Sequence, residues 1–315
     1  MLLSVIIPCY NEEDNINPFF DEMEKVRQQI QNDTDLELVF VDDGSSDRTF
    51  DLLYDLSKTH SFVKYVRFSR NFGKEAAMLA GLENALGDYV VLIDADLQDP
   101  PSLIPEMLDL IRGGEYDRIA TRRIDRTGEP PIRSFLAKMF YKIINKISNV
   151  RIMDGARDFS MMSRRMVNSI LSLKERTRFT KGLFEWAGFQ THWISFNNHQ
   201  RNDGKTKWSL FKLFRYSIEG IVSFSSLPLV ISSVIGLMLF LLSIIMIIAI
   251  IVKKVFFGDP VEGWPSLACI ILFVSGLQQM CIGVLGSYLS RVFIETKQRP
   301  IYVVMDSNTE EHKRS

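Results

Sequence analysis

Short apolar runs and longer segments with helical periodicity alternate along the first third of the chain. Four apolar runs have the length and β-branched content of buried strands: residues 4–8, 36–41, 63–68 and 89–93. After each run, apolar residues recur at helical spacing, over residues 13–31, 47–58, 74–86 and 102–112. Strands that alternate with helices predict an α/β fold with a mostly parallel sheet.

The pattern is less regular in the middle of the chain. Residues 132–147 and 176–187 have helical spacing, and residues 192–196 favour a strand. Residues 154–165 contain a short strand, which we expect to begin at Asp158. A basic group formed by Arg122, Arg123 and Arg126 is predicted to lie in a loop, either closing over a site or simply solvated.

Two long apolar runs follow. Residues 221–252 hold no ionisable side chain, and residues 264–290 hold no Asp, Glu, Lys, Arg or His. Each run exceeds the roughly 20 residues that cross a bilayer core, so we expect two transmembrane helices. The alternative is two buried helices of a soluble domain, but the first run is apolar all round rather than along one face.

Basic residues near these runs predict their orientation. The linker between the runs holds Lys253 and Lys254, whereas the outer flanks hold more basic residues: Lys205, Lys207, Lys212, Arg215, Arg291, Lys297 and Arg299. By the positive-inside rule, both termini and the α/β domain face the cytoplasm and the linker lies outside. Gln278 and Gln279 within the second run predict contact with another helix, and hence a homo-oligomer.

Residues 205–226, directly before the first run, have an aromatic face and a basic edge. Trp208, Phe211 and Phe214 recur at helical spacing, with Lys212 and Arg215 away from them. This pattern favours an amphipathic helix in the headgroup region of a membrane. An ordinary core-packing helix has a similar pattern. The chain thus divides into a domain over residues 1–204, this helix, a two-helix hairpin over 227–291 and a cytoplasmic tail over 292–315.

Composition excludes some classes of function. The chain has 315 residues and a formal net charge of −1, so no basic excess points to nucleic acid. Its three cysteines are scattered, without disulfide or zinc spacing, which favours a reducing compartment. The amino terminus lacks the basic segment of a signal peptide and is expected to form the first strand.

Acidic and aromatic side chains follow the predicted strands. The most distinctive set is Asp94, Asp96 and Gln98, just after the fourth strand. Paired carboxylates are hard oxygen donors that suit Mg²⁺ or Mn²⁺ held together with phosphate oxygens. Acids also follow strands merely because loops are solvated. Polar residues at the ends of the other three strands favour a site, since ligands of parallel sheets lie at the carboxyl ends of strands.

Four motifs occur in order: PCYNEE at 8–13, VDDGSSDRT at 41–49, NFGKEAA at 71–77 and DADLQDPP at 94–101. Together they resemble the inverting family-2 glycosyltransferases with a GT-A fold. DFSMMSR at 158–164, RNDGKTKW at 201–208 and the two apolar runs extend the resemblance to the polyprenyl-phosphate branch, which includes dolichol-phosphate mannose synthases and bactoprenol glucosyltransferases.

The resemblance implies roles for individual residues. The nucleotide-sugar would be bound by Pro8, Tyr10, Glu12, Asp42, Asp43, Lys74 and Asp94. Asp94, Asp96 and Gln98 would hold the metal, with Asp96 as the expected direct ligand. Asn11 and Ser45, in the same motifs, are better explained by turn formation.

Asp158 matches the position of the family's catalytic base. A polyprenyl phosphate has a second pKa of about 6 and is mostly dianionic at neutral pH, so Asp158 would position it or take a residual proton. Loop capping is the alternative role. Arg201, Lys205 and Lys207 would pair with phosphates. The chain departs from the family at Ser160, where relatives often carry Arg, which puts a phosphate contact there in doubt.

The resemblance implies an enzyme that transfers one hexose from a nucleotide-diphospho-sugar to a polyprenyl phosphate, with inversion and a divalent cation. A UDP-sugar of glucose type fits it best. Two other hypotheses are a processive polysaccharide synthase and a catalytically inactive membrane-anchored scaffold. A synthase would carry a Gln-x-x-Arg-Trp signature, which residues 181–208 lack, and the intact Asp94, Asp96 and Asp158 argue against a scaffold.

Overall fold

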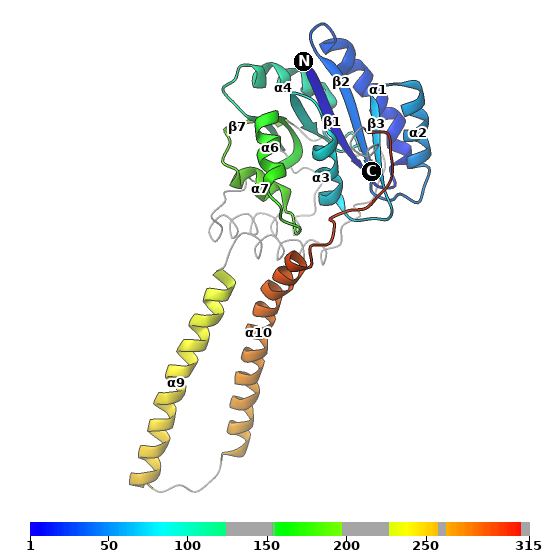
Figure 1. Cartoon of the computed structure of the whole chain (residues 1–315). Helices are drawn as coiled ribbons and strands as arrows, with labels where there is room; N and C mark the ends of the chain where they lie inside the picture. The colour runs from blue at the N-terminus through cyan, green and yellow to red at the C-terminus, as the bar shows by residue number, and fades with distance from the viewer. Residues whose placement is uncertain (124–152, 154, 197–226, 258–262, 310–315) are drawn as a thin grey trace.

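The computed structural model describes residues 1–123, 153, 155–196, 227–257 and 263–309. Figure 1 shows an α/β domain from which two long helices extend side by side in one direction. The predicted helices over 132–147 and 205–226 lie outside the described residues.

The first half of the domain follows the predicted alternation. Four parallel strands form the centre of the sheet: β1 (Leu2–Cys9), β2 (Asp35–Asp42), β3 (Val63–Phe68) and β4 (Tyr89–Leu92). The connecting helices are α1 (Glu13–Ile30), α2 (Thr49–Thr59) and α3 (Lys74–Asn84), and β4 is followed by the short helix η1 (Pro101–Leu103) and α4 (Ile104–Arg112). All four predicted strands and all four predicted helices are confirmed.

The other strands make the sheet mixed. Its order is β7-β5-β6-β4-β1-β2-β3-β8. Strand β6 (Ala156–Ser163) runs antiparallel to β4 and to β5 (Arg118–Arg123), while β7 (Thr191–Phe196) is parallel to β5. Helices α6 (Arg164–Ser172) and α7 (Thr180–Trp186) follow β6. An α/β fold with a mostly parallel sheet is therefore confirmed, with antiparallel strands towards both edges.

Three local expectations need correction. Asp158 is the third residue of β6 rather than its first, because the pairing with β5 already begins at Ala156. Arg122 and Arg123 belong to β5 and do not form a loop, since they pair with β7. The predicted helix over 176–187 begins only at Thr180.

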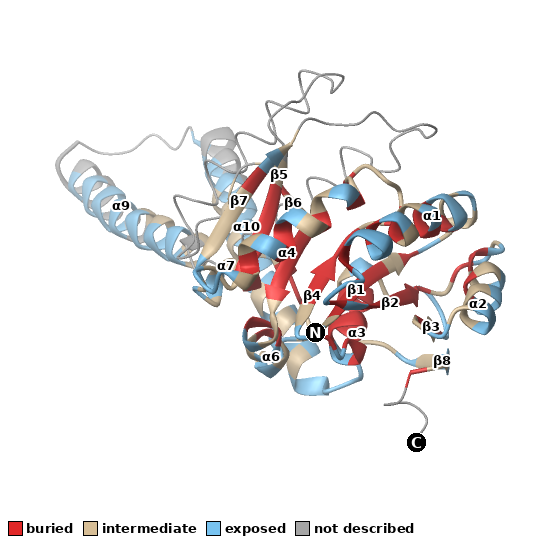
Figure 2. Cartoon of the chain, turned by 90° about the horizontal axis from the view of Figure 1, so that it is seen from above, coloured by how far each residue is buried: buried red, intermediate tan, exposed pale blue. Residues whose placement is uncertain are grey.

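Helices cover both faces of the sheet, and Figure 2 shows the buried residues concentrated in the strands. On one face Leu3, Val5 and Ile7 pack with α1 and α4, and on the other Ile6 packs with α3 and α6. Gly81 allows the close approach of α3, because a Cβ atom there would lie 2.1 Å from Cγ2 of Ile6. This packing holds α3 against the sheet, with the first residue of the helix near the carboxyl end of the central strand β4.

The two extended helices are α9 (Leu227–Phe257) and α10 (Trp264–Lys297). Within the described part of the chain, one helical stretch is long and apolar enough to cross a membrane, Pro228–Met246 in α9. Many large apolar side chains of both helices face away from the protein, including Leu237 and Phe273. The second span stays a prediction.

After α10 the chain returns to the sheet. Strand β8 (Val304–Ser307) pairs antiparallel with β3, and the ring of Tyr302 stacks on Phe68 at 4.7 Å. Asn308 accepts a 2.7 Å hydrogen bond from the backbone of Tyr65. The segment that the sequence suggested as a tail thus contains an edge strand of the α/β domain.

Candidate active site

The loops after β1 and β2 are locked together. Asn11 has a left-handed backbone with φ of 53°, its amide N–H donates to Ser45 Oγ at 3.0 Å, and its side-chain oxygen accepts from Ser46 N at 2.9 Å. Asn and Ser are suited to such local bonds. The predicted turn-forming role of Asn11 and Ser45 is confirmed.

The residues expected to bind a nucleoside surround this junction. Tyr10 is 44% exposed, and Pro8 lies beside Val41, one residue before β1 ends at Cys9. Asp42 is fully buried, accepts from Ser45 N at 2.9 Å and lies 3.6 Å from Arg67 Nε. Its second oxygen has no hydrogen bond, and burial raises the pKa of its carboxyl group. An unsatisfied buried carboxylate oxygen is costly, and a ligand hydroxyl would satisfy it.

Asp43 has a different environment. Its carboxylate accepts hydrogen bonds from the backbone of Phe72 at 2.6 Å and of Gly73 at 2.9 Å. Gly73 has a φ of 101°, which favours glycine. Asp43 therefore holds the loop that leads into α3, whose first residue is Lys74. A nucleotide contact by Asp43 stays a prediction, as does the one proposed for Glu12, which binds the Asn15 side chain at 2.5 Å.

Lys74 connects two predicted site residues. Its Nζ lies 2.7 Å from Oδ1 of Asp94 and 2.6 Å from Oδ2 of Asp158. The other carboxylate oxygen of Asp158 lies 3.6 Å from Nζ of Lys181, which comes from α7. Residues from α3, β6 and α7 thus meet Asp94 at the carboxyl end of β4, and charges of opposite sign alternate along the group.

These neighbours fix the protonation states. Loss of surrounding water would raise the pKa of Asp158, but Lys181 and Lys74 outweigh it and hold that pKa well below its ordinary value. Loss of water likewise opposes the charge of Lys74, yet Asp158 and Asp94 raise the pKa of its ammonium group. At neutral pH Asp158 is a carboxylate and a weak base, and Lys74 is a cation.

The predicted metal ligands lie just after β4. Asp96 accepts from the backbone of Gln98 at 3.1 Å, and Arg157 reaches Gln98 Oε1 at 3.5 Å. Within the described ranges, no three His, Cys, Asp or Glu side chains are grouped to hold a metal ion. Asp94 and Asp96 nevertheless fit Mg²⁺ or Mn²⁺, since such ions are held by one or two carboxylates together with substrate phosphates.

Sequence reasoning missed Arg157, Asp99 and Lys181. Arg157 forms a two-pronged ion pair with Asp99, at 2.8 and 3.2 Å, which anchors the loop of Asp96 to β6. Arg157 immediately precedes Asp158, which was a signal for its involvement. Lys181 had none, because only the fold brings α7 to Asp158.

Other predicted residues contribute less or cannot be placed. Ser160, where a phosphate-binding Arg was expected from the family, is buried, and its hydroxyl donates to the carbonyl of Asp158 at 3.3 Å. It cannot supply a positive charge. Arg201, Lys205 and Lys207 lie outside the described residues, so their roles stay predictions.

Comparisons with known proteins identify the family. Residues 4–171 match the family described as glycosyl transferase family 2. An uncharacterised glycosyltransferase of Synechocystis sp. is 43% identical and covers 96% of this chain and 95% of its own length. The bactoprenol glucosyl transferase of Shigella phage SfII is 38% identical, covering 98% of this chain and 99% of its own. A solved glucosyl-3-phosphoglycerate synthase of Mycobacterium tuberculosis aligns with 70% of this chain and 77% of its own, at 20% identity and a TM-score of 0.45.

A mixed α/β sheet with charged side chains at the carboxyl ends of its parallel strands has the place where α/β proteins bind their ligands. The chain belongs to glycosyl transferase family 2 and is a glycosyltransferase.

Proposed function

We propose that this enzyme transfers a single hexose from a nucleotide-diphospho-sugar to a polyprenyl phosphate at the cytoplasmic face of a membrane, with inversion. The donor is a UDP-sugar of glucose type. The observation that carries the proposal is the alternating group of Asp94, Lys74, Asp158 and Lys181, in a chain that aligns with a bactoprenol glucosyl transferase over nearly its whole length.

The charge pattern suits two phosphate-bearing substrates. An oxygen of the acceptor phosphate attacks the anomeric carbon in line and forms a new carbon–oxygen bond. The bond to the donor diphosphate breaks, and the nucleoside diphosphate leaves with the bonding electrons. In this reaction Lys74 and Lys181 offset the negative charge that two substrates bring together.

Asp158 acts by position in this proposal. Its depressed pKa makes it a poor proton acceptor, and the acceptor phosphate is already mostly dianionic at neutral pH. The carboxylate holds Lys74 and Lys181 on its two oxygens and thereby fixes where positive charge meets the acceptor. The positioning role explains why an aspartate lies beside an acceptor phosphate that needs little deprotonation.

Asp94 and Asp96, with Gln98 nearby, would hold Mg²⁺ or Mn²⁺. Such a cation neutralises the leaving diphosphate as a Lewis acid. Lys74 already contacts Asp94, so the donor diphosphate would approach a carboxylate whose charge is partly balanced.

The fold supports two membrane crossings. Strands β1 to β7 precede α9, and β8 follows α10 in the same sheet. A chain that leaves a domain and returns to it crosses a membrane an even number of times. If Pro228–Met246 crosses, α10 is the return. The juxtamembrane segment, with Arg201, Lys205 and Lys207, would then present the lipid phosphate.

A homo-oligomer fits the same arrangement. Gln278 and Gln279 are exposed on α10 within the single chain. Amide side chains in a bilayer are best satisfied by another helix. We therefore propose that α10 contacts a second copy of the chain.

One experiment tests the proposed function. Purified protein is incubated with undecaprenyl phosphate, Mn²⁺ and a panel of radiolabelled nucleotide sugars, and the lipid fraction is extracted. We expect one sugar, supplied as its UDP derivative, to appear in the lipid as a monosaccharide. Labelled chains of several sugars would instead favour a processive synthase. No labelled lipid with any donor would favour a scaffold.

A further inference from the structure

The segment between α6 and α7, residues 173–179, is held from three sides. Arg178 donates to the carbonyls of Leu173 at 2.8 Å and Ile170 at 3.3 Å, which ties the segment to the end of α6. Arg178 is itself buried. This contact fixes the segment within the α/β domain.

The second contact comes from the helix that follows the apolar hairpin. Oε1 of Glu295, near the end of α10, accepts the backbone N–H of Arg176 at 2.8 Å and of Thr177 at 3.3 Å. Hydrogen bonds from backbone N–H groups to a carboxylate are among the stronger ones in proteins. Glu295 is half-buried, whereas Thr296 beside it is exposed and donates a hydrogen bond within α10, to the carbonyl of Phe293 at 3.1 Å.

The third contact joins the segment to the active site. Glu75 accepts from both the backbone N–H, at 3.0 Å, and the hydroxyl of Thr180, the first residue of α7. Glu75 adjoins Lys74 in α3, and Thr180 adjoins Lys181. The two lysines that contact Asp158 are therefore neighbours in sequence of the two residues that make this contact.

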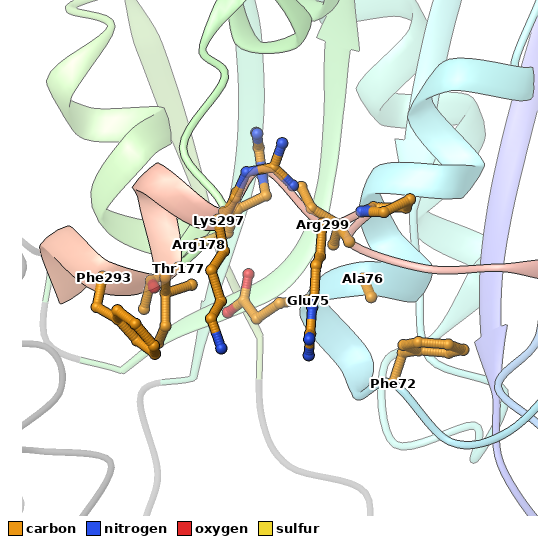
Figure 3. Close-up of a pocket in the computed structure, with 12 residues that line it drawn as sticks. Phe72, Glu75, Ala76, Thr177, Arg178, Phe293, Lys297 and Arg299 are labelled. Atoms are coloured by element: carbon orange, nitrogen blue, oxygen red, sulfur yellow. The ribbon is translucent and has the colours of Figure 1, made fainter. Parts of the chain in front are cut away.

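Figure 3 shows the pocket of about 500 Å³ that these elements enclose. Glu75 from α3, Thr177 and Arg178 from the segment, and Phe293 and Lys297 from α10 line it. The carboxylates of Glu75 and Glu295 make hydrogen bonds that connect the elements around this cavity.

We propose that Glu295 is a positioning residue, through which α10 holds the segment of residues 173–179 and so places Lys181 of the following helix beside Asp158. The rate of sugar transfer then depends on how α10 packs against the α/β domain, although Glu295 itself touches neither substrate. The kinetic part of this inference rests on the proposed function. The structural part, in which Glu295 holds residues 173–179 in place, does not rest on the proposed function.

Hydrogen–deuterium exchange tests the placement directly. In Glu295→Ala, peptides covering residues 174–181 should exchange faster than in the wild type, while peptides of β1 and β2 should not change. Glu295→Gln keeps an oxygen that can accept the same bonds and should retain most of the protection. Thr296→Ala, the matched control on the same turn, should behave as the wild type. Unchanged exchange at 174–181 in Glu295→Ala overturns the proposal.

Kinetics test the consequence. Glu295→Ala should lower kcat by about ten- to a hundredfold, since small misplacements of catalytic groups cost that much, with the KM for the nucleotide sugar within about twofold. Glu295→Gln should recover most of kcat. Faster exchange with an unaltered kcat would refute the coupling to catalysis. If the wild type transfers no sugar, the proposed function fails, and the exchange comparison alone decides whether Glu295 holds the segment.

Discussion

Lys74 and Asp158 are 84 residues apart in the sequence, yet Nζ of one lies 2.6 Å from Oδ2 of the other. The same ammonium group contacts Asp94, which follows the central strand β4. One cation thus joins the carboxylate expected to act on the donor side to the carboxylate expected to act on the acceptor side.

Replacement of this cation should affect transfer strongly. Lys74→Met should lower kcat by about 100-fold, the usual effect of removing one preorganised group that stabilises developing charge. Sugar transfer to undecaprenyl phosphate is the measurement. Lys58→Met, an exposed lysine on α2, is the control and should have no effect. A Lys74→Met enzyme with transfer within twofold of the wild type would exclude this role.

Lys181 should set the acidic limb of the pH profile. Because Lys181 and Lys74 lower the pKa of Asp158, the wild-type carboxylate stays ionised well below neutral pH. Its stabilising ion pairs are present above the unfolded-state pKa of about 4 and are lost only as pH falls towards the lower folded-state value. Lys181→Met should raise the pKa of Asp158, so that kcat begins to fall at a higher pH.

The control for that profile is Lys181→Arg, which keeps the positive charge and should retain an acidic limb close to that of the wild type. If kcat falls at the same acidic pH in the wild type and in Lys181→Met, a group other than Asp158 controls the acidic limb.

Sugar transfer should require a divalent cation that Asp96 binds. Chelation with EDTA should abolish transfer by the wild type, and added Mn²⁺ or Mg²⁺ should restore it, because the diphosphate needs charge neutralisation. Asp96→Asn should lower transfer by about 100-fold or more at any concentration of the cation, and Asp109→Asn, exposed on α4, should not. Full activity of Asp96→Asn in membranes would refute the assignment.

The return of the chain to the sheet should stabilise the α/β domain. Tyr302→Ala removes the ring that stacks on buried Phe68 and should lower the free energy of unfolding by about 1–3 kcal/mol. Thermal unfolding in detergent measures the effect. Met305→Ala on β8 is the control, since Met305 is 65% exposed. Equal midpoints for the two variants would mean that the stacking contributes nothing.

Membrane topology can be tested by labelling. Glu262→Cys, in the linker between α9 and α10, should react with a membrane-impermeant maleimide in intact cells. Asp55→Cys, exposed on α2, should react only after lysis. Labelling of both residues, or of neither, in intact cells would contradict two spans with a cytoplasmic α/β domain.

The sequence predicted the parts of the fold that depend on local pattern. Strands β1 to β4 and helices α1 to α4 follow from apolar periodicity, and their order placed Asp42, Asp94 and Asp96 on one edge of the sheet. The turn roles of Asn11 and Ser45 followed from residue chemistry alone.

The remainder depends on contacts between distant segments. Nothing in the local pattern around Lys181 indicates that α7 lies beside β6, and nothing near Val304 indicates an edge strand. The residues of β8 have only a weak hydrophobic pattern. A strand could be predicted there only with the knowledge that β3 has an unpaired edge. The hydrogen bonds that Asp43 accepts from Phe72 and Gly73 could not be predicted either, because the sequence does not specify the path of that loop.

The docking of β8 on β3 also constrains biosynthesis. A ribosome makes β3 long before β8, with the whole α9–α10 hairpin in between. Until the hairpin is made, the edge of β3 has unpaired backbone groups, which are prone to pair with other chains. The sheet can therefore be completed only after the hairpin has been synthesised. A chain arrested between α9 and α10 should be a target for chaperones and proteases.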